Sequence, residues 1–332
     1  MNFFQILHDL AQADPDLAGR LDTRRRVFRH FAGWGKAAGA AALPAVVGAL
    51  FNKAYGQGSA TRLPAAVADV LNLALQLEYL EYHFYDRGLA ANFLSASDQA
   101  AALLIRNDES GHVKTLRAAL GTQAFSLADP TAAAFDYTAG GQFADVFSRP
   151  ATFFAVAQAF EDTGVRAYKG ALPALLTSTD LLTVGMQIHS VEARHASHVR
   201  TIRRGLSLGV TGASAAQVPA DPANLDSRPK SWVSGTDKSS SANPATAFTA
   251  VYGAGRPANG LSNELYYPAE GNTRQLGQNT ATFAVPLSLT TNEPLRALAA
   301  TEAFDEPLDA ATVLSIARLF RSAAGASQGL FV

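Results

Sequence analysis

The middle of the chain carries four long patterns in which apolar residues recur at positions i, i+3, i+4 and i+7. This spacing places apolar side chains on one face of an α-helix. The patterns predict four helices, over about Leu63–Leu89, Ser97–Leu120, Pro150–Leu176 and Asp180–Leu206. Each is long enough to span a small domain and would bury its apolar face against the others.

The connections between these helices differ in length. Short turns near Ala91–Leu94 and Thr177–Thr179 join the first helix to the second and the third to the fourth, whereas the longer stretch Gly121–Arg149 separates the two pairs. Two short-linked hairpins joined by one long crossover are typical of ferritin-like bundles. We therefore predict an all-α fold, a ferritin-like antiparallel four-helix bundle with one long crossover.

The helical pattern is lost after Leu206. Pro, Gly, Ser, Asn and Thr dominate Gly209–Asn279, and such a stretch cannot bury a large core of its own. A last helix is predicted near 309–322, capped by Asp309, with Val313, Ile316 and Phe320 on its apolar side. The chain thus divides into an N-terminal segment (1–56), the bundle (57–207) and an irregular C-terminal extension (208–332).

The N-terminal segment has the layout of an export signal. A basic cluster at Arg24–Arg26 and Arg29 precedes an Ala/Gly-rich apolar run, Phe31–Phe51, and a small-residue exit at Ala54–Gly56. The string Arg25-Arg26-Val27-Phe28-Arg29 resembles the twin-arginine signal, which directs export of folded, often cofactor-loaded proteins. We expect an exported protein of the periplasm or cell envelope, with membrane association through this segment. The alternative is a buried helix with a basic flank.

The amino-acid composition limits the partners and the kinds of metal site that can be expected. The chain has 332 residues, of which 48% are hydrophobic and 17% charged, as in a folded globular protein. Its formal net charge of -1 gives no reason to expect a nucleic-acid partner, since phosphate binding needs a concentrated positive surface. It contains no cysteine, which excludes disulfides, thiolate metal sites and iron–sulfur clusters in this chain. Any metal must be held by oxygen and imidazole nitrogen.

Two Glu-x-x-His pairs, Glu109/His112 and Glu192/His195, supply such groups. Residues three apart share a helix face, so each pair directs one carboxylate and one imidazole toward the same point. The first and third helices each add a glutamate on the apolar face, at Glu78 and Glu161. Carboxylates on a buried stripe need a compensating partner.

The spacing of these residues repeats. Glu78 precedes Glu109 by 31 residues (109 − 78), and Glu161 precedes Glu192 by the same number (192 − 161). The two halves are offset by 83 residues (161 − 78 and 192 − 109), and this offset also relates the histidines and the tyrosine pair Tyr85 and Tyr168. Two helical hairpins of this kind encode a two-fold symmetric binuclear site.

Charge explains why such a site would hold metal. Four carboxylates in a low-dielectric bundle would repel one another, and each would lose several kcal/mol of hydration. Two divalent cations cancel four negative charges, and iron or manganese suits an oxygen-rich shell best. This is the ligand pattern of di-iron and di-manganese carboxylate bundles. We predict two ions held by Glu78, Glu109, His112, Glu161, Glu192 and His195, with Tyr85 and Tyr168 hydrogen-bonded to the opposite carboxylates.

Other residues near the ligands leave alternatives. Glu81 lies near the same face as Glu78 and could replace or supplement it. Asp108 and Asp162 adjoin ligands in sequence, but we expect them to be solvated or to cap helices. His83, His189 and His198 are expected away from the ions. The alternative for the whole constellation is a buried salt-bridge network with Arg106, Arg166 and Arg194.

The chain resembles bacterial ferritin-like proteins related to plant desiccation-related proteins, a branch of the ferritin and rubrerythrin superfamily. The resemblance covers about Leu63–Leu206, and its most specific parts are LEYLEYHFY, the paired Glu-x-x-His motifs and the string AFDEPLD (Ala303–Asp309). It implies the same six ligands. It also implies the fold and the metal more firmly than an activity.

Three functions are compatible with these observations. The first is a di-metal oxidoreductase acting on oxygen or peroxide, of ferroxidase, peroxidase or catalase type. The second is a non-enzymatic, exported stress-protective or structural protein whose metals only brace the bundle, which the long polar extension favours. The third is iron storage in a cage. A homo-oligomer is possible in each case.

Overall fold

The structure, a computed structural model, describes residues 62–126, 128–207, 209, 250–253, 274–275, 278–279 and 305–332. The predicted export signal and most of the C-terminal extension therefore lie outside the described residues. The domain boundaries at 56 and 207 stay predictions. Within the described ranges, none of the helices is both long and apolar enough to span a bilayer.

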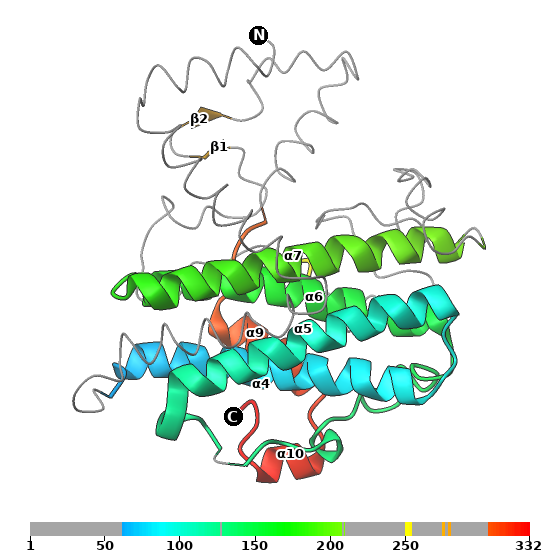
Figure 1. Ribbon diagram of the computed structural model, residues 1–332, viewed down its shortest axis with the longest axis horizontal. Coiled ribbons are helices and arrows are strands. Elements are labelled where there is room, and N and C mark those ends of the chain that lie inside the picture. Colours follow the sequence, from blue (N-terminus) through cyan, green and yellow to red (C-terminus); the bar gives the residue numbers. More distant parts are fainter. Residues whose placement is uncertain are drawn as a thin grey trace, which may run out of the picture. The chain divides into compact units, whose positions relative to one another are not determined.

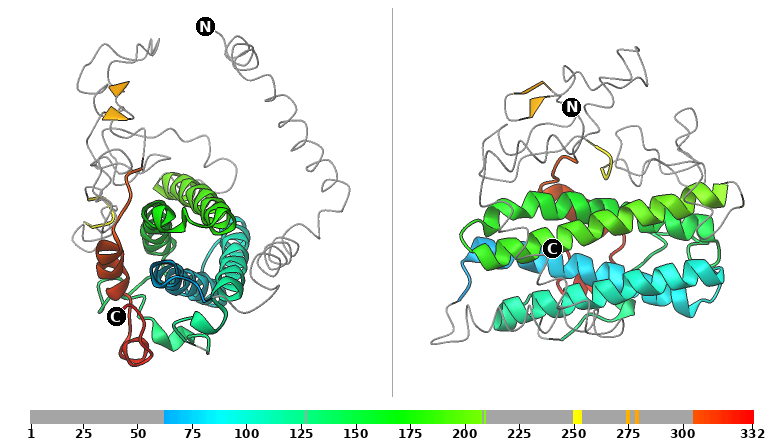
Figure 2. Two further views of the ribbon diagram at one scale, coloured as in Figure 1. Left: turned by 90° about the vertical axis from the view of Figure 1, so that its left-hand side faces the viewer. Right: turned by 45° about the horizontal axis from the view of Figure 1, so that its top comes forward.

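Four long helices form the core of the fold (Figure 1): α4 (Ala65–Ala90), α5 (Ala96–Leu120), α6 (Pro150–Ala171) and α7 (Thr179–Ser207). Helix α4 packs along α5, and α6 along α7, as two hairpins that contact each other through α4 with α6 and α5 with α7. Seen end on, the helices occupy the four corners of a bundle (Figure 2). The predicted all-α four-helix bundle with one long crossover is confirmed.

The helix ends follow local sequence signals. The Ser95 side chain caps α5 by accepting a hydrogen bond from the Asp98 amide at 3.2 Å, and Gly121, with φ of 53°, ends that helix. Pro150 begins α6, where its missing N–H costs nothing. Helix α6 stops at Ala171, before the predicted Leu176, because the chain tightens into the 3₁₀ helix η3 (Leu172–Leu175), which contains Pro173.

The crossover contains two 3₁₀ helices, η1 (Gly121–Gln123) and η2 (Ala132–Ala134), and packs on α4. The Tyr137 hydroxyl donates a hydrogen bond to the Leu80 carbonyl at 2.8 Å. Aromatic rings from the crossover and from α4 and α6 interlock around the stacked pair Phe84 and Phe153, whose centroids are 4.5 Å apart. Tyr85 borders this cluster, with its ring 5.3 Å from that of Phe84 and 5.9 Å from that of Phe153, so the aromatic cluster adjoins the buried polar groups described below.

The C-terminal residues form two short helices rather than the single helix predicted over 309–322. Asp309 caps α9 (Ala310–Arg318) as expected, accepting from the Thr312 amide at 2.7 Å. The helix ends early because Ser322 caps a second helix, α10 (Ala323–Ser327). Helix α9 lies outside the bundle beside α4 and α6 (Figure 2). In the extension, β1 (Arg274–Gln275) and β2 (Gln278–Asn279) form a two-stranded antiparallel ladder.

The residues flanking α9 and α10 are fastened to the bundle. The Leu308 amide donates to the Arg166 carbonyl at 3.1 Å, and the Phe331 amide donates to Gln76 Oε1 at 2.5 Å. Gly170 lies under Leu308 so closely that a Cβ atom there would overlap the Leu308 carbonyl. The C-terminal end of the chain is therefore part of the fold.

Asp162 corrects one expectation from the sequence. It is not solvated and caps no helix, because its side chain is fully buried and paired with the buried Arg200 at 2.5 Å. The Tyr252 hydroxyl also donates to it at 2.9 Å. A charge so far from water needs such partners, and here they come from α7 and from the C-terminal extension.

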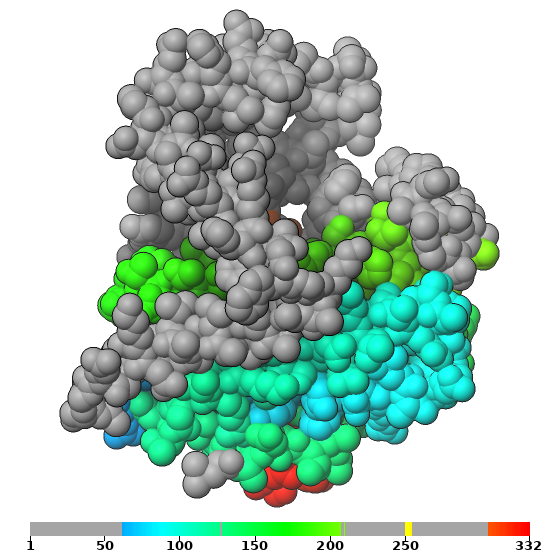
Figure 3. All heavy atoms as spheres, in the orientation of Figure 1, coloured from blue at the N-terminus to red at the C-terminus, as the bar shows by residue number. Residues whose placement is uncertain are grey.

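The space-filling view shows side chains of the α4–α5 hairpin and of α7 meeting on this face of the bundle (Figure 3). The buried glutamates of all four helices, Glu78, Glu109, Glu161 and Glu192, lie beneath this surface in the core.

Candidate metal centre

All six residues predicted as ligands point into the core of the bundle, from four helices. The structure places Glu78 on α4, Glu161 on α6, Glu109 and His112 on α5, and Glu192 and His195 on α7. The four carboxylates are 0% exposed, and the imidazoles are 8% and 2% exposed. We call these six side chains the glutamate–histidine cluster.

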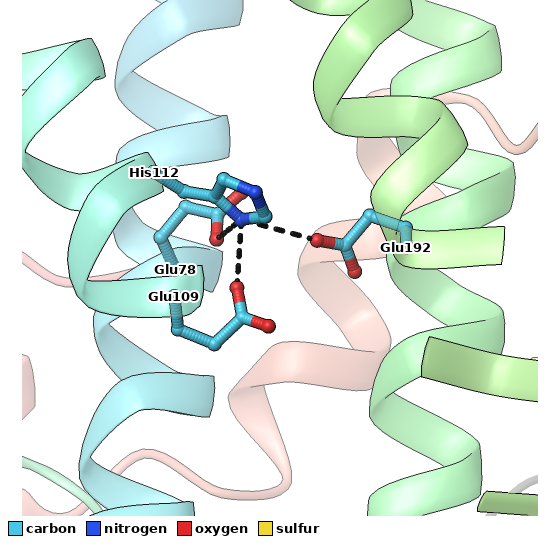
Figure 4. Close-up of side chains that lie close together, drawn as sticks. All are labelled: Glu78, Glu109, His112 and Glu192. Atoms are coloured by element: carbon cyan, nitrogen blue, oxygen red, sulfur yellow. Dashed lines mark hydrogen bonds and ion pairs between the residues drawn. The ribbon is translucent and has the colours of Figure 1, made fainter. Parts of the chain in front are cut away.

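One part of the cluster, the His112 position, consists of Glu78, Glu109, His112 and Glu192 (Figure 4). Each offers one ligand atom, and these atoms all lie within 4.8 Å of one another. His112 Nδ1 is 3.0 Å from Glu78 Oε2, 2.8 Å from Glu109 Oε2 and 3.4 Å from Glu192 Oε1. Three carboxylates from three helices therefore surround one imidazole nitrogen.

The other part, the His195 position, consists of Glu109, Glu161 and His195, whose ligand atoms meet the same distance criterion. His195 Nδ1 lies 2.9 Å from Glu109 Oε1 and 3.3 Å from Glu161 Oε2. Glu109 directs one oxygen toward each imidazole. It is therefore the carboxylate that the two positions share.

The carboxylate oxygens and imidazole nitrogens of the cluster would interact more favourably with a bound cation than they do with one another. Among the described residues, five buried atoms of the cluster make no hydrogen bond of good geometry, although four of them lie at ion-pair distance from another member of the cluster: Glu109 Oε1, Glu161 Oε2, both oxygens of Glu192, and His195 Nδ1. A buried polar atom without a hydrogen bond costs about 1–3 kcal/mol. All five are oxygens or imidazole nitrogens of the kind that bind divalent iron or manganese. The residues present therefore fit a metal centre.

Electrostatics lead to the same conclusion. Burial raises the pKa of Glu192 well above its ordinary value, with the charge of Glu109 adding to the effect, and raises the pKa of Glu78 to about 7 against the opposing effect of His112. Burial also raises the pKa of Glu109, but His112 and His195 together leave it below its ordinary value. Four ionised carboxylates are thus unfavourable here unless a cation neutralises them.

Burial shifts the pKa values of the two histidines in the direction opposite to those of the carboxyl groups. Burial lowers their pKa values, yet the neighbouring carboxylates, Glu78 and Glu109 at His112 and Glu161 and Glu109 at His195, raise them well above the ordinary value. Without metal, the imidazoles therefore hold protons that a cation would have to displace.

Two tyrosines hold the outer carboxylates. The Tyr85 hydroxyl on α4 donates to Glu161 Oε1 on α6, and the Tyr168 hydroxyl on α6 donates to Glu78 Oε1 on α4. Burial and then the nearby negative charge raise both tyrosine pKa values well above the ordinary value, so both remain donors. Each hydrogen bond occupies one carboxylate oxygen and leaves the other directed toward an imidazole.

Glu81 is close to the cluster but belongs to neither position. It is 3% exposed, and its pKa is raised well above the ordinary value by burial first and then by the charge of Glu192. The structure places Glu78, rather than Glu81, beside His112. Glu81 is thus an additional buried carboxylate next to the centre.

Asp108 is a further functional candidate, which was not expected from the sequence. Its carboxylate is not simply solvated, because it contacts one of the cluster histidines. Asp108 Oδ2 lies 3.1 Å from His195 Nε2 and 3.3 Å from Arg194 Nη2. A carboxylate behind a histidine fixes the tautomer and the orientation of the ring. The sequence signal was its place directly before Glu109, but its partner lies on α7, which spacing within one helix does not reveal.

The arginines of the alternative salt-bridge network have other partners in the structure. Arg106 faces Asp86 at 3.7 Å, Arg194 pairs with Asp108, and Arg166 donates to the Glu306 carbonyl at 2.8 Å. His83, expected away from the ions, contacts the Pro130 carbonyl at 2.9 Å. These contacts do not favour the salt-bridge alternative.

Comparison with known proteins agrees with the fold. Searches of curated proteins and of solved structures gave no match. Residues 66–204 match the family model described as a ferritin-like domain, and this range contains the whole glutamate–histidine cluster. The described bundle is accordingly a ferritin-like domain with a buried group of glutamates and histidines that can hold metal.

Proposed function

We propose that this domain binds two divalent ions, iron or manganese, one at the His112 position and one at the His195 position, and uses them in redox chemistry on oxygen or peroxide. The observation that carries the proposal is the gathering of four fully buried carboxylates and two buried imidazoles from four helices. Their ligand atoms form two groups, and within each group these atoms lie within 4.8 Å of one another.

When bound, two such ions would supply electrons to oxygen or peroxide. The chain contributes what surrounds that chemistry. Four carboxylates balance the charge of two dications, and Glu109 directs an oxygen to each position. Tyr85 and Tyr168 hold the outer carboxylates in place, and full burial of the glutamates keeps bulk water away.

The experiment has two stages. Elemental analysis of protein isolated from its host should find iron or manganese at about two ions per chain, following the two groups of ligands. Stopped-flow mixing of the reduced, metal-loaded protein with oxygen or hydrogen peroxide should then show oxidation of the bound ions, each giving up one electron to the oxidant. Glu109→Gln should abolish this reaction, whereas Asp180→Asn, which changes an exposed acidic residue on α7, should not.

The outcomes separate the candidate functions. Protein without bound metal would contradict the proposal. Bound metal that reacts with neither oxidant would favour the alternative of a stress-protective or structural protein whose ions brace the bundle. A mass measurement of the native protein shows whether it forms a homo-oligomer, and only a large closed assembly would favour iron storage.

Export is part of the proposal and rests on the sequence of the N-terminal segment. Arg25 and Arg26 precede an Ala/Gly-rich apolar run, in the order of a twin-arginine signal. We expect the protein in the periplasm or cell envelope, consistent with its resemblance to desiccation-related proteins and with membrane association through this segment. Replacing both arginines by lysine should retain the protein in the cytoplasm, and fractionation measures this.

A further inference from the structure

The two hairpins repeat with an offset of 83 residues, but the repeat fails at several positions beside the cluster, and two of these carry an acidic residue on the first hairpin only. Glu81 on α4 corresponds to Gly164 on α6 (164 − 81), and Asp108 on α5 corresponds to Val191 on α7 (191 − 108). Both acidic residues lie on the first hairpin. The surroundings of the two metal positions are therefore not equivalent, although their six ligands are related by the repeat.

Gly164 has a clear structural role. A Cβ atom there would overlap Oε2 of Glu192, so the Glu192 carboxylate occupies the space that a side chain at position 164 would fill. A glutamate at position 164 would have to displace the Glu192 carboxylate. The additional carboxyl group of Glu81, which is 3% exposed, is thus present once beside the cluster.

The His112 position also has more ligands of its own. Three carboxylates and one imidazole nitrogen lie within 4.8 Å of one another there, against two carboxylates and one imidazole nitrogen at the His195 position. Attraction of a dication grows with each nearby negative charge. The larger number of ligands favours this position for the first ion.

Asp108 supports the other position, but less strongly. It faces the ring nitrogen of His195 that points away from the cluster, and Val191 cannot accept a hydrogen bond in the equivalent way at His112. The Asp108 side chain is 29% exposed, and it also forms an ion pair with Arg194, whose side chain is 64% exposed. Solvent and the guanidinium group therefore weaken its charge, so its main effect is to orient the imidazole.

We infer that the two positions bind metal unequally: the His112 position takes the first ion, and the His195 position takes a second, more weakly bound ion whose retention depends on Asp108. This inference rests on the proposed binuclear centre and adds an order of filling to it. It makes the second ion the one that exchanges or is lost first.

Titration of the metal-free full-length protein tests the order of filling. Calorimetry with Mn²⁺, together with the visible absorption of Co²⁺, should resolve two steps whose affinities differ by about tenfold or more. Asp108→Asn should weaken the second step about 10–100-fold and leave the first unchanged. The control Asp180→Asn should change neither step.

Two further variants locate each step without relying on Asp108. His195→Gln should remove the second step and keep the first, whereas His112→Gln should remove the tighter step. Two equal steps, or a first step weakened by Asp108→Asn or removed by His195→Gln, would overturn the inference and leave the binuclear centre standing. Absence of any Mn²⁺ or Co²⁺ binding would instead contradict the proposed function.

Discussion

The hydroxyl group of Tyr168 on α6 donates a hydrogen bond to Oε1 of Glu78 on α4. The repeat supplies the reciprocal bond, from Tyr85 on α4 to Glu161 on α6. Each hairpin thus orients the outer carboxylate of the other, so the geometry of the cluster depends on the docking of the two hairpins. The tyrosines connect the fold to the candidate centre.

Removal of either hydroxyl should therefore weaken metal binding. We expect Tyr168→Phe and Tyr85→Phe each to lower the affinity for divalent metal about 10-fold, because outer partners of ligands typically contribute 10–100-fold. Competition with a chelator measures the affinity, and circular dichroism checks that the bundle is intact. Unchanged affinity in both variants would show that the tyrosines do not position the carboxylates.

The shared position of Glu109 predicts a difference between two matched substitutions. Glu109→Gln removes a ligand from both positions and should leave the purified protein without stoichiometric metal. Glu161→Gln affects only the His195 position and should leave about one ion per chain. Elemental analysis distinguishes the two variants, and equal loss of metal in both would contradict the shared role of Glu109.

Protons should stabilise the metal-free protein. The pKa of Glu78 is about 7 in the folded state against an ordinary value of 4.5, so the folded state binds this proton more tightly. Its contribution to the free energy of unfolding is complete below pH 4.5 and is lost as the pH rises to 7, on the order of 3 kcal/mol. Glu161, Glu192 and both histidines have raised pKa values and act in the same direction.

Thermal unfolding of the metal-free protein between pH 5.5 and pH 8 checks the sign. The melting temperature should fall as the pH rises, and addition of Mn²⁺ should remove most of the fall, because metal replaces the protons. Glu109 does not alter this expectation, because its pKa is lowered and its carboxyl group therefore titrates below this pH range. A melting temperature that rises with pH in the absence of metal would contradict these pKa shifts.

Close packing of the C-terminal residues on α6 predicts a stability effect away from the centre. Gly170→Ala places a methyl group against the Leu308 carbonyl and should cost about 1–3 kcal/mol, because backbone must move. Gly111→Ala is the matched control on α5, since no atom lies within 4 Å of its Cβ position, and it should stabilise the helix by about 1 kcal/mol. Denaturant unfolding of both variants measures the contrast, and equal stability would be inconsistent with a docked C-terminal segment.

Much of the fold and the positions of the cluster residues could be read from the sequence. Helix periodicity gave four helices with ends close to the observed ones, and the 83-residue repeat identified six side chains that the structure brings together. Relationships between helices were less accessible. The contact of Asp108 with His195 and the burial of Asp162 against Arg200 join residues far apart in the chain, and no local spacing encodes them.

The most direct test of the binuclear centre is anomalous X-ray scattering from crystals of the native protein, recorded on both sides of the iron and manganese absorption edges. Two peaks inside the bundle are expected, one beside His112 Nδ1 and one beside His195 Nδ1, with Glu109 between them. Absence of any anomalous peak within the glutamate–histidine cluster, with or without a peak elsewhere on the chain, would contradict a metal centre at this place.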